Sequence, residues 1–247
     1  MVGSNDILLK KLIESQYVKS VLEIGSGLCS TPIIRNAMKK KNGYCLSIED
    51  KKEWYNKVTQ ILPNDKFGSV ELYSLIWKNN KLIYDFETDK KFDFILIDSP
   101  YLDTKTIDKK ISQNLFQYLS NHDTHWIETV FKNISKGKGG IASINILEYV
   151  KNFSHENTII MVDRRRSAVY YYLRHYKNIF DFYGWQDGTW NKNTRIDRDI
   201  THFKKRYKHI PNHITPGKAT IICFKGNTII EKICKEKSIT LYNYLKE

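Results

Sequence analysis

Two carboxylic acids and a glycine pair are spaced along residues 21–98 in a way that suits the binding of a nucleoside. Gly25 and Gly27 follow an apolar run, and glycine permits both a sharp turn and a close approach of a ligand to the main chain. Free amide N–H groups at the start of the next helix would then point at that ligand. Glu49 follows Gly25 by 24 residues, near the spacing at which a doubly wound fold places a ribose-binding carboxylate. Asp98 ends a further apolar run.

The glycine turn differs from that of dinucleotide-binding proteins. Those proteins carry glycines as G-x-G-x-x-G, whereas Ser30 occupies the third position here. This difference argues against a pyrophosphate ligand and for a smaller ligand without phosphate. Plainer interpretations of the same residues stay open. The segment Gly25 to Gly27 can be an ordinary turn between a strand and a helix, Glu49 an acid that stabilises a helix N-terminus, and Asp98 a loop-capping residue.

Strands and helices must alternate along the chain to position these residues. The expected strands lie at 20–25, 44–49, 69–75, 92–98, 158–163, 179–183 and 219–224, and the expected helices at 5–17, 31–40, 51–62 and 165–177. Ile7 is expected on the buried side of the helix at 5–17, and Ile61 on that of the helix at 51–62. Helical patterns also cover 107–119 and 124–134, and the tail from 228 onward favours neither helix nor strand.

This order predicts an α/β fold of the Rossmann-like, doubly wound kind. Repeated strand–helix–strand units give right-handed crossovers, and hence a mostly parallel seven-stranded sheet with helices on both faces and an antiparallel terminal hairpin. Ligands bind beyond the carboxyl ends of such strands, where Gly25, Glu49, Ser74 and Asp98 all fall. Residues 1–247 contain no linker or repeat, so we expect a single domain with insertions at about 101–156 and 184–218.

Composition narrows the class of protein without identifying a partner. Hydrophobic residues make up 41% of the 247 residues, and no run of uncharged apolar residues is long enough to offer a membrane span. The first residues lack the order of a secretion signal, so a cytoplasmic location is expected. The formal charge of +13 attracts polyanions, whether nucleic acid, an anionic glycan, a phosphorylated substrate or a membrane surface. The sequence predicts no particular oligomeric state.

The sequence resembles the class I S-adenosylmethionine-dependent methyltransferases over roughly residues 18–170. The resemblance rests on the acidic-x-Gly-x-Gly turn from Glu23 to Gly27, on Glu49 followed by Trp54, and on the strand end Ile-Asp-x-Pro at Asp98. It implies S-adenosylmethionine as the cofactor and methyl transfer as the activity. The implied cofactor site comprises Glu23, Gly25, Ser26, Gly27 and Ser30 at the methionine part, Glu49 at the ribose, Ser74 and Leu75 along the adenine, and Asp98.

At the reacting end, the resemblance points to Asp98 as a base or as a carboxylate that orients the acceptor, with Tyr101 close by in sequence. Asp163 closes a later strand. Arg166 follows in a run of three arginines, and a guanidinium there is suited to holding an anionic acceptor. We therefore expect Asp98, Tyr101, Asp163 and Arg166 to form the catalytic group.

No metal is expected. Relatives with this type of strand end often carry a second acid after Asp163, whereas this chain has Arg164, and one carboxylate beside three guanidiniums is a poor cation site. His122 and His125 have the spacing of two ligands on one helix face, but no third ligand accompanies them.

The acceptor is the least determined part of the function. The segment 47–55 resembles small-molecule and glycan methyltransferases, which favours a small-molecule or glycan-type acceptor methylated on oxygen or nitrogen. The alternative is a nucleic-acid amino-methyltransferase, because Asp98-Ser99-Pro100-Tyr101 resembles their Asp-Pro-Pro-Tyr motif with Ser99 in place of the first proline. A cofactor-binding fold without catalysis, acting as a basic binding module, is a further alternative.

Overall fold

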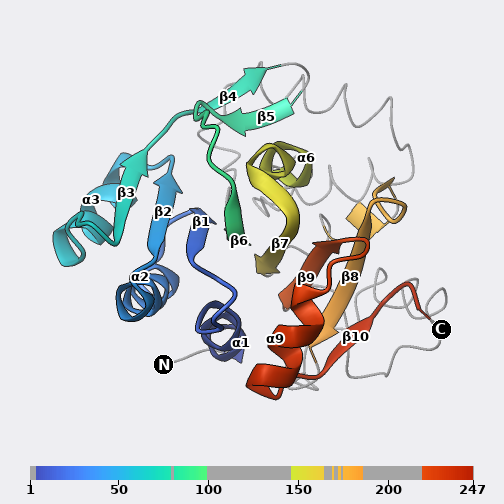
Figure 1. Ribbon diagram of the computed structural model, residues 1–247. Helices are drawn as coiled ribbons and strands as arrows, with labels where there is room; N and C mark the ends of the chain where they lie inside the picture. Colours follow the sequence, from blue (N-terminus) through green and yellow to red (C-terminus); the bar gives the residue numbers. More distant parts are fainter. Residues whose placement is uncertain are drawn as a thin grey trace, which may run out of the picture.

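An eight-stranded sheet lies at the centre of the structure (Figure 1). The coordinates are those of a computed structural model. They describe residues 4–78, 81–98, 146–163, 169, 172–173, 175–185 and 219–246. Most of the two expected insertions, at 101–156 and 184–218, lies outside these residues, so the single-domain organisation stays a prediction.

The first half of the chain alternates helix and strand as predicted. Its elements are α1 (Ser4–Ile13), β1 (Ser20–Ile24), α2 (Ser30–Lys41), β2 (Tyr44–Glu49), α3 (Lys52–Ile61) and β3 (Gly68–Leu72). The boundary between α2 and β2 is sharp because Asn42 ends the helix in the left-handed conformation, with φ 53°, a conformation that asparagine tolerates better than most residues. The strand predicted at 44–49 is confirmed, because β2 begins and ends at the predicted residues.

The second half contains a hairpin that the sequence did not predict. The strand expected at 69–75 ends at Leu72, and β4 (Leu75–Lys78) pairs with β5 (Lys81–Tyr84) in a separate two-stranded sheet. A hydrogen bond of 2.8 Å from the N–H of Asp85 to the carbonyl of Ser74 closes the base of this hairpin. The other described elements are β6 (Phe92–Ile97), α6 (Ile146–Val150), the 3₁₀-helix η2 (Lys151–Phe153), β7 (Ser154–Asp163), β8 (Phe180–Trp185), β9 (Ala219–Phe224), α9 (Ile229–Lys237) and β10 (Leu241–Asn243).

The strand order defines where a ligand can bind. In the main sheet the order is β10-β8-β9-β7-β6-β1-β2-β3, with β3, β2, β1, β6 and β7 parallel to one another. β9 runs antiparallel to both β7 and β8, which confirms the predicted antiparallel hairpin, and β10 adds an eighth strand in the unassigned tail. The chain order reverses direction at β1, between β2 and β6. In doubly wound sheets the crevice at such a reversal binds the ligand.

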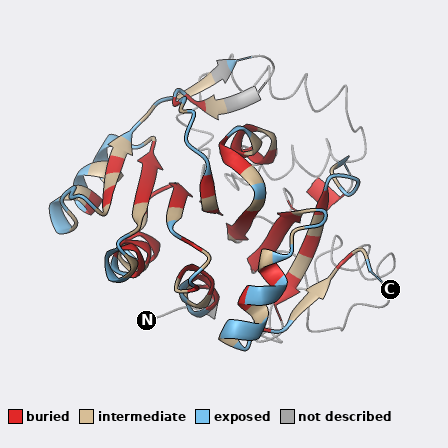
Figure 2. Cartoon of the chain, in the orientation of Figure 1, coloured by how far each residue is buried: buried red, intermediate tan, exposed pale blue. Residues whose placement is uncertain are grey.

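The sheet separates two apolar clusters, because successive side chains of each strand point to opposite faces. Leu22 and Ile24 of β1 pack on the side of α6, whereas Val21 packs on the side of α1, α2 and α9. Figure 2 shows the central strands buried over most of their length. The α/β class with helices on both faces is thereby confirmed. Of the described helices, none is long and apolar enough to cross a membrane.

Two expectations about helix faces are wrong. Ile7 of α1 is 47% exposed, and Ile61 at the end of α3 is 63% exposed. In α1 the buried apolar residues are Leu8, Leu9, Leu12 and Ile13, so Leu9 is buried where Ile7 was expected. Ile61 is the last residue of α3, in which Val58 is the buried residue.

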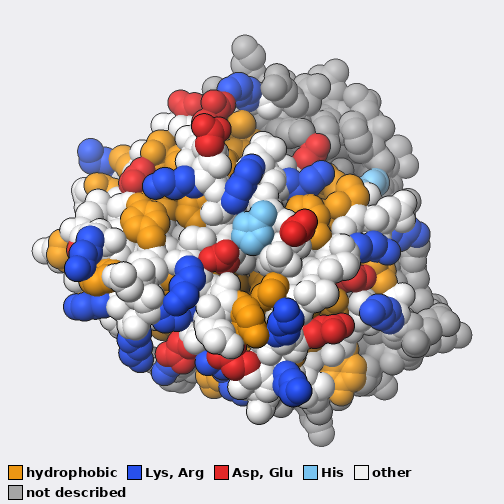
Figure 3. Space-filling model, viewed as in Figure 1, with side chains coloured by type: hydrophobic (Ala, Val, Ile, Leu, Met, Phe, Trp, Pro, Cys, Tyr) orange, Lys and Arg blue, Asp and Glu red, His pale blue; other side chains and the backbone are white. Residues whose placement is uncertain are grey.

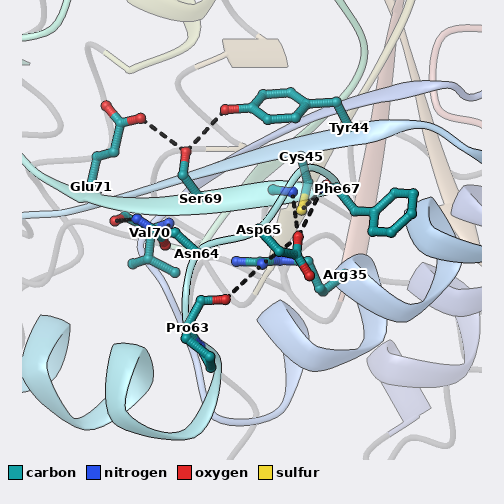
Figure 4. A network of polar contacts seen from close by, with 11 residues as sticks. Arg35, Tyr44, Cys45, Pro63, Asn64, Asp65, Phe67, Ser69, Val70 and Glu71 are labelled. Atoms are coloured by element: carbon teal, nitrogen blue, oxygen red, sulfur yellow. Dashed lines mark hydrogen bonds and ion pairs between the residues drawn. The ribbon is translucent and has the colours of Figure 1, made fainter.

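A buried arginine fixes the start of β3 (Figure 4). Arg35 of α2, which is 4% exposed, donates hydrogen bonds from Nη1 to the carbonyl of Pro63 at 3.2 Å and to the carboxylate of Asp65 at 3.0 Å. A Cβ atom at position 68 would lie 2.8 Å from Nε of Arg35 and 2.4 Å from Sγ of Cys45. The first residue of β3 must therefore be glycine, because no larger residue fits beside these two side chains.

Candidate functional site

A pocket of about 350 Å³ opens at the carboxyl ends of β1, β2 and β6, beside the reversal of strand order. It is lined by Gly25, Ser26, Gly27, Glu49, Asp50, Lys51, Glu53, Trp54 and Asp98. Five of the residues predicted for the cofactor site thus meet around one pocket, although the segments that carry them are far apart in the sequence.

The loop between β1 and α2 is held by its own main-chain amides. Gly25 has φ 91°, a conformation that favours glycine, and its N–H donates to the carbonyl of Ile48 at 2.8 Å. The N–H of Ser26 donates to Glu49 at 3.1 Å, and that of Gly27 to Oγ1 of Thr31 at 2.8 Å. The N–H groups of residues 25–27 therefore have partners within the protein, whereas the expected free N–H groups of the helix start stay a prediction. A Cβ at position 27 would lie 2.7 Å from Oγ of Ser30, so glycine makes room there for that side chain.

Glu49 joins the two loops that border the pocket. Its side chain is buried, and Oε2 accepts hydrogen bonds from the N–H and the hydroxyl of Ser26, at 3.1 and 3.0 Å. Oε1 accepts from the N–H groups of Asp50 and Lys51, at 3.1 and 3.0 Å. Burial raises the pKa of Glu49, and the hydrogen bonds from Lys51 and Ser26 oppose that rise. The carboxylate lines the pocket, as the predicted ribose contact requires.

Glu23 lies beneath the glycine loop, fully buried. Its Oε2 accepts hydroxyl hydrogen bonds from Thr31 at 2.7 Å and from Ser47 at 2.5 Å. Its Oε1 is buried and has no hydrogen-bond partner among the described residues. Burial raises the pKa of Glu23 to about 7, against the lowering by the neighbouring hydroxyls of Ser30, Ser47 and Thr31. Glu23 thus organises the turn from below, and it does not itself line the pocket.

We expect Glu23 to make the protein less stable as the pH rises from about 4.5 to about 7. The unfolded chain loses this proton near the ordinary pKa of 4.5, whereas the folded chain keeps it to about 7, so the folded state binds more protons in this range. The free energy of unfolding should fall by up to roughly 3 kcal/mol across it, at 1.36 kcal/mol for each pKa unit. Urea unfolding at several pH values measures this slope.

Glu23→Gln removes the titrating group and should flatten that slope. Glu87→Gln is the matched control, because Glu87 is exposed and its pKa is lowered by Lys78. If Glu23→Gln unfolds with the same pH dependence as the unchanged protein, Glu23 is not the group that titrates.

Two side chains that the sequence did not assign to the loop turn out to hold it. Thr31 accepts from Gly27 and donates to Glu23, and so links the loop to the acid beneath it. Trp54 of α3 donates from Nε1 to the carbonyl of Ser26 at 2.6 Å. In the sequence, Trp54 stands out because it follows Glu49, and Thr31 because it begins the helix expected at 31–40. Neither position indicates which backbone group the side chain contacts.

The remaining predicted site residues lie apart from the pocket lining. Ser30 is buried, with Oγ 2.7 Å from where a Cβ of residue 27 would be. Ser74 and Leu75 form the base of the β4–β5 hairpin, and Asp163 accepts a hydrogen bond from Nδ2 of Asn5 in α1. The N-terminus of α1 therefore lies beside the end of β7.

Several predicted residues fall outside the described part of the chain. These are Tyr101, Arg166, His122 and His125. Within the residues that the structure describes, no group of three or more His, Cys, Asp or Glu side chains is arranged to hold a metal ion.

No protein-family model matches this sequence, and no curated protein matches it significantly. Solved structures do match. The chain is similar to an O-methyltransferase from Bacillus cereus in complex with SAH, at 14% identity and a TM-score of 0.40, over 90% of this chain and 80% of that one. It is also similar to the O-methyltransferase TomG from Streptomyces achromogenes, at 11% identity and 0.41, over 90% and 80%.

A third similar structure is that of the protein PH0851, at 10% identity and a TM-score of 0.50. It matches over 90% of this chain, which spans 45% of that protein. At such identities the likeness is one of fold. The parallel strands, their reversal at β1 and the antiparallel pairing of β8 with β9 agree with the predicted sheet and its terminal hairpin. The chain therefore has a Rossmann-like, doubly wound fold.

Proposed function

We propose that the protein is an S-adenosylmethionine-dependent methyltransferase that acts on a small-molecule or glycan-type acceptor, on oxygen or nitrogen. The observation that carries the proposal is the meeting of Gly25, Glu49 and Asp98 around one pocket at the carboxyl ends of the strands. A glycine turn, a ribose-binding acid and a carboxylate at the reacting end are the three parts that such an enzyme needs. Each comes from a different strand end.

The described residues fit this cofactor in size and charge. A pocket of about 350 Å³ lies within the range of pockets that hold small ligands. Its lining carries the acids Glu49, Asp50, Glu53 and Asp98 against the single base Lys51. This acidic lining, in a chain with a formal charge of +13, favours a ligand that carries positive charge, as a sulfonium and an ammonium group do.

The roles of the residues follow from their positions. In the proposed complex, Glu49 accepts hydrogen bonds from the ribose, and the loop of Gly25 to Gly27 allows the methionine part to approach the backbone. S-adenosylmethionine supplies an electrophilic methyl group, and transfer needs the acceptor atom held in line with it at about 3–3.5 Å. Asp98 orients the acceptor and accepts its proton where the acceptor is a hydroxyl. Asp163 and Arg166 remain proposed contacts of the acceptor.

The alternative acceptor is nucleic acid, supported by the net charge and by the segment 98–101. The resemblance of the segment 47–55 to small-molecule and glycan methyltransferases supports the small acceptor. On the described part of the face seen in Figure 3, Lys and Arg side chains are scattered among acidic ones. Binding of random oligonucleotides at increasing salt separates the two. Phosphate contacts give a steep loss of affinity with salt, whereas a flat response removes nucleic acid as the acceptor.

Calorimetric titration with S-adenosylmethionine and with S-adenosylhomocysteine tests the proposal. Both should bind at one site per chain, and NAD should not, because Ser30 replaces the glycine of a pyrophosphate-binding turn. Absence of binding by both compounds to folded protein, as judged by circular dichroism, would refute the proposed function.

A further inference from the structure

We propose that the hydroxyl of Ser26 competes with the cofactor's ribose for Glu49, so that Ser26 limits how tightly this protein binds its cofactor. The inference rests on the proposed function. An ordinary binding residue increases the affinity for the cofactor, whereas the Ser26 hydroxyl is proposed to decrease it.

The carboxylate of Glu49 has its hydrogen-bonding capacity filled by protein donors. A carboxylate offers about four lone-pair sites. The N–H and hydroxyl of Ser26 occupy Oε2, and the N–H groups of Asp50 and Lys51 occupy Oε1, all between 3.0 and 3.1 Å. A ribose hydroxyl can therefore donate to Glu49 only where one of these four donors gives way.

The four donors differ in how easily they can leave. Three are main-chain N–H groups, fixed by the turns that follow β1 and β2. The fourth is the Ser26 hydroxyl, which one side-chain torsion can rotate between staggered positions. Ser26 also lines the pocket, so its hydroxyl can turn from Glu49 into the same space that a ligand enters. The exchange then costs one hydrogen bond and leaves the loop backbone in place.

A second role for Ser26 predicts the opposite effect. If its hydroxyl serves to hold Glu49 in position for the ribose, its removal should weaken cofactor binding. If it competes, its removal should strengthen binding, because the ligand then displaces a water from Glu49 in place of a side-chain hydroxyl of the protein. The sign of the change in affinity therefore decides between the two roles.

The experiment compares Ser26→Ala with the unchanged protein, using adenosine and S-adenosylhomocysteine as probes in calorimetric titration. We expect the variant to bind both roughly 3- to 10-fold more tightly, since a water that replaces the hydroxyl on Glu49 is displaced more cheaply than the side chain. The gain should be absent for 2′,3′-dideoxyadenosine, which lacks the competing hydroxyls, and absent when Glu49 is also changed to Ala.

Ser69→Ala is the matched control. The Ser69 hydroxyl donates to the carboxylate of Glu71 at 2.9 Å, outside the pocket lining (Figure 4). This variant loses a serine–glutamate hydrogen bond of the same kind, and we expect its affinity for adenosine to be unchanged.

The outcomes separate this inference from the proposed function. If the unchanged protein binds neither probe, the proposed function fails and the inference fails with it. If it binds both but Ser26→Ala binds them equally or more weakly, only the inference is overturned. Ser26→Gly, which also lacks the hydroxyl, repeats the test should Ser26→Ala not fold. A crystal structure of the unchanged protein with S-adenosylhomocysteine gives a further check: Oγ of Ser26 still on Glu49 beside a bound ribose would overturn the inference.

Discussion

Glu49→Ala should weaken the binding of S-adenosylmethionine by roughly 100-fold or more. Hydrogen bonds to a charged group contribute about 1.5–3 kcal/mol each, and a factor of ten in affinity corresponds to about 1.4 kcal/mol. The proposed site loses two contributions at once, the acceptor for the ribose and the anchor of two loops, because Glu49 holds Ser26 on one side and Asp50 and Lys51 on the other. Calorimetric titration measures the loss.

Glu71→Ala is the control for Glu49→Ala. Glu71 lies on the neighbouring strand β3 and its carboxylate accepts hydrogen bonds from Ser69 and Tyr73, outside the pocket lining. Its removal should leave cofactor affinity unchanged. Unaltered affinity in folded Glu49→Ala would show that the ribose is held elsewhere, and would contradict the proposed site.

Asp98→Ala should lower the rate of methyl transfer by roughly 100- to 10,000-fold, the usual contribution of a positioned acid or base, while cofactor affinity changes little. Asp98 follows β6 and lines the pocket together with the glycine loop. Its N–H donates to the carbonyl of Ile24 at 3.0 Å. The rate is measured as transfer of a labelled methyl group to the best acceptor found in a panel of hydroxyl and amino compounds.

The control for Asp98→Ala is Asp89→Ala, in which an exposed acid before β6 is removed. It should transfer at the rate of the unchanged protein. Transfer at that rate by Asp98→Ala as well would exclude Asp98 as the base. Tight cofactor binding by the unchanged protein, with no transfer to any acceptor, would instead favour the non-catalytic binding module.

The sequence predicted the elements around the pocket well because glycine, asparagine and proline mark their boundaries. The turn at Gly25, the left-handed Asn42 and Pro63 after α3 each mark an end that local conformation decides. With these ends in place, the order of parallel strands follows from the alternation of elements, and the meeting of Glu49 with the glycine loop follows from the strand order.

What the sequence could not predict depends on contacts between distant residues. The break after Leu72 arises where Ser74 turns to pair with Asp85, and no glycine or proline marks it. The exposure of Ile7 depends on where α2 and α9 lie against α1, which the period of apolar residues does not specify. Likewise, the acceptor sites of Glu49 are occupied by loop N–H groups whose direction is set only once both loops are folded.

The hydrogen bond between Glu23 and Ser47 has a consequence for how the sheet assembles. β1 and β2 are buried on both faces, so burial alone would accept a pairing shifted by one residue. In the observed pairing, Glu23 is the direct partner of Ser47. A shift would set the carboxylate against Leu46 or Ile48, so that Glu23 would lose the hydroxyl of Ser47 and keep that of Thr31 while still buried. The Glu23–Ser47 hydrogen bond therefore helps to specify the register of β1 against β2, because shifted pairings are less stable. This contribution does not depend on any ligand.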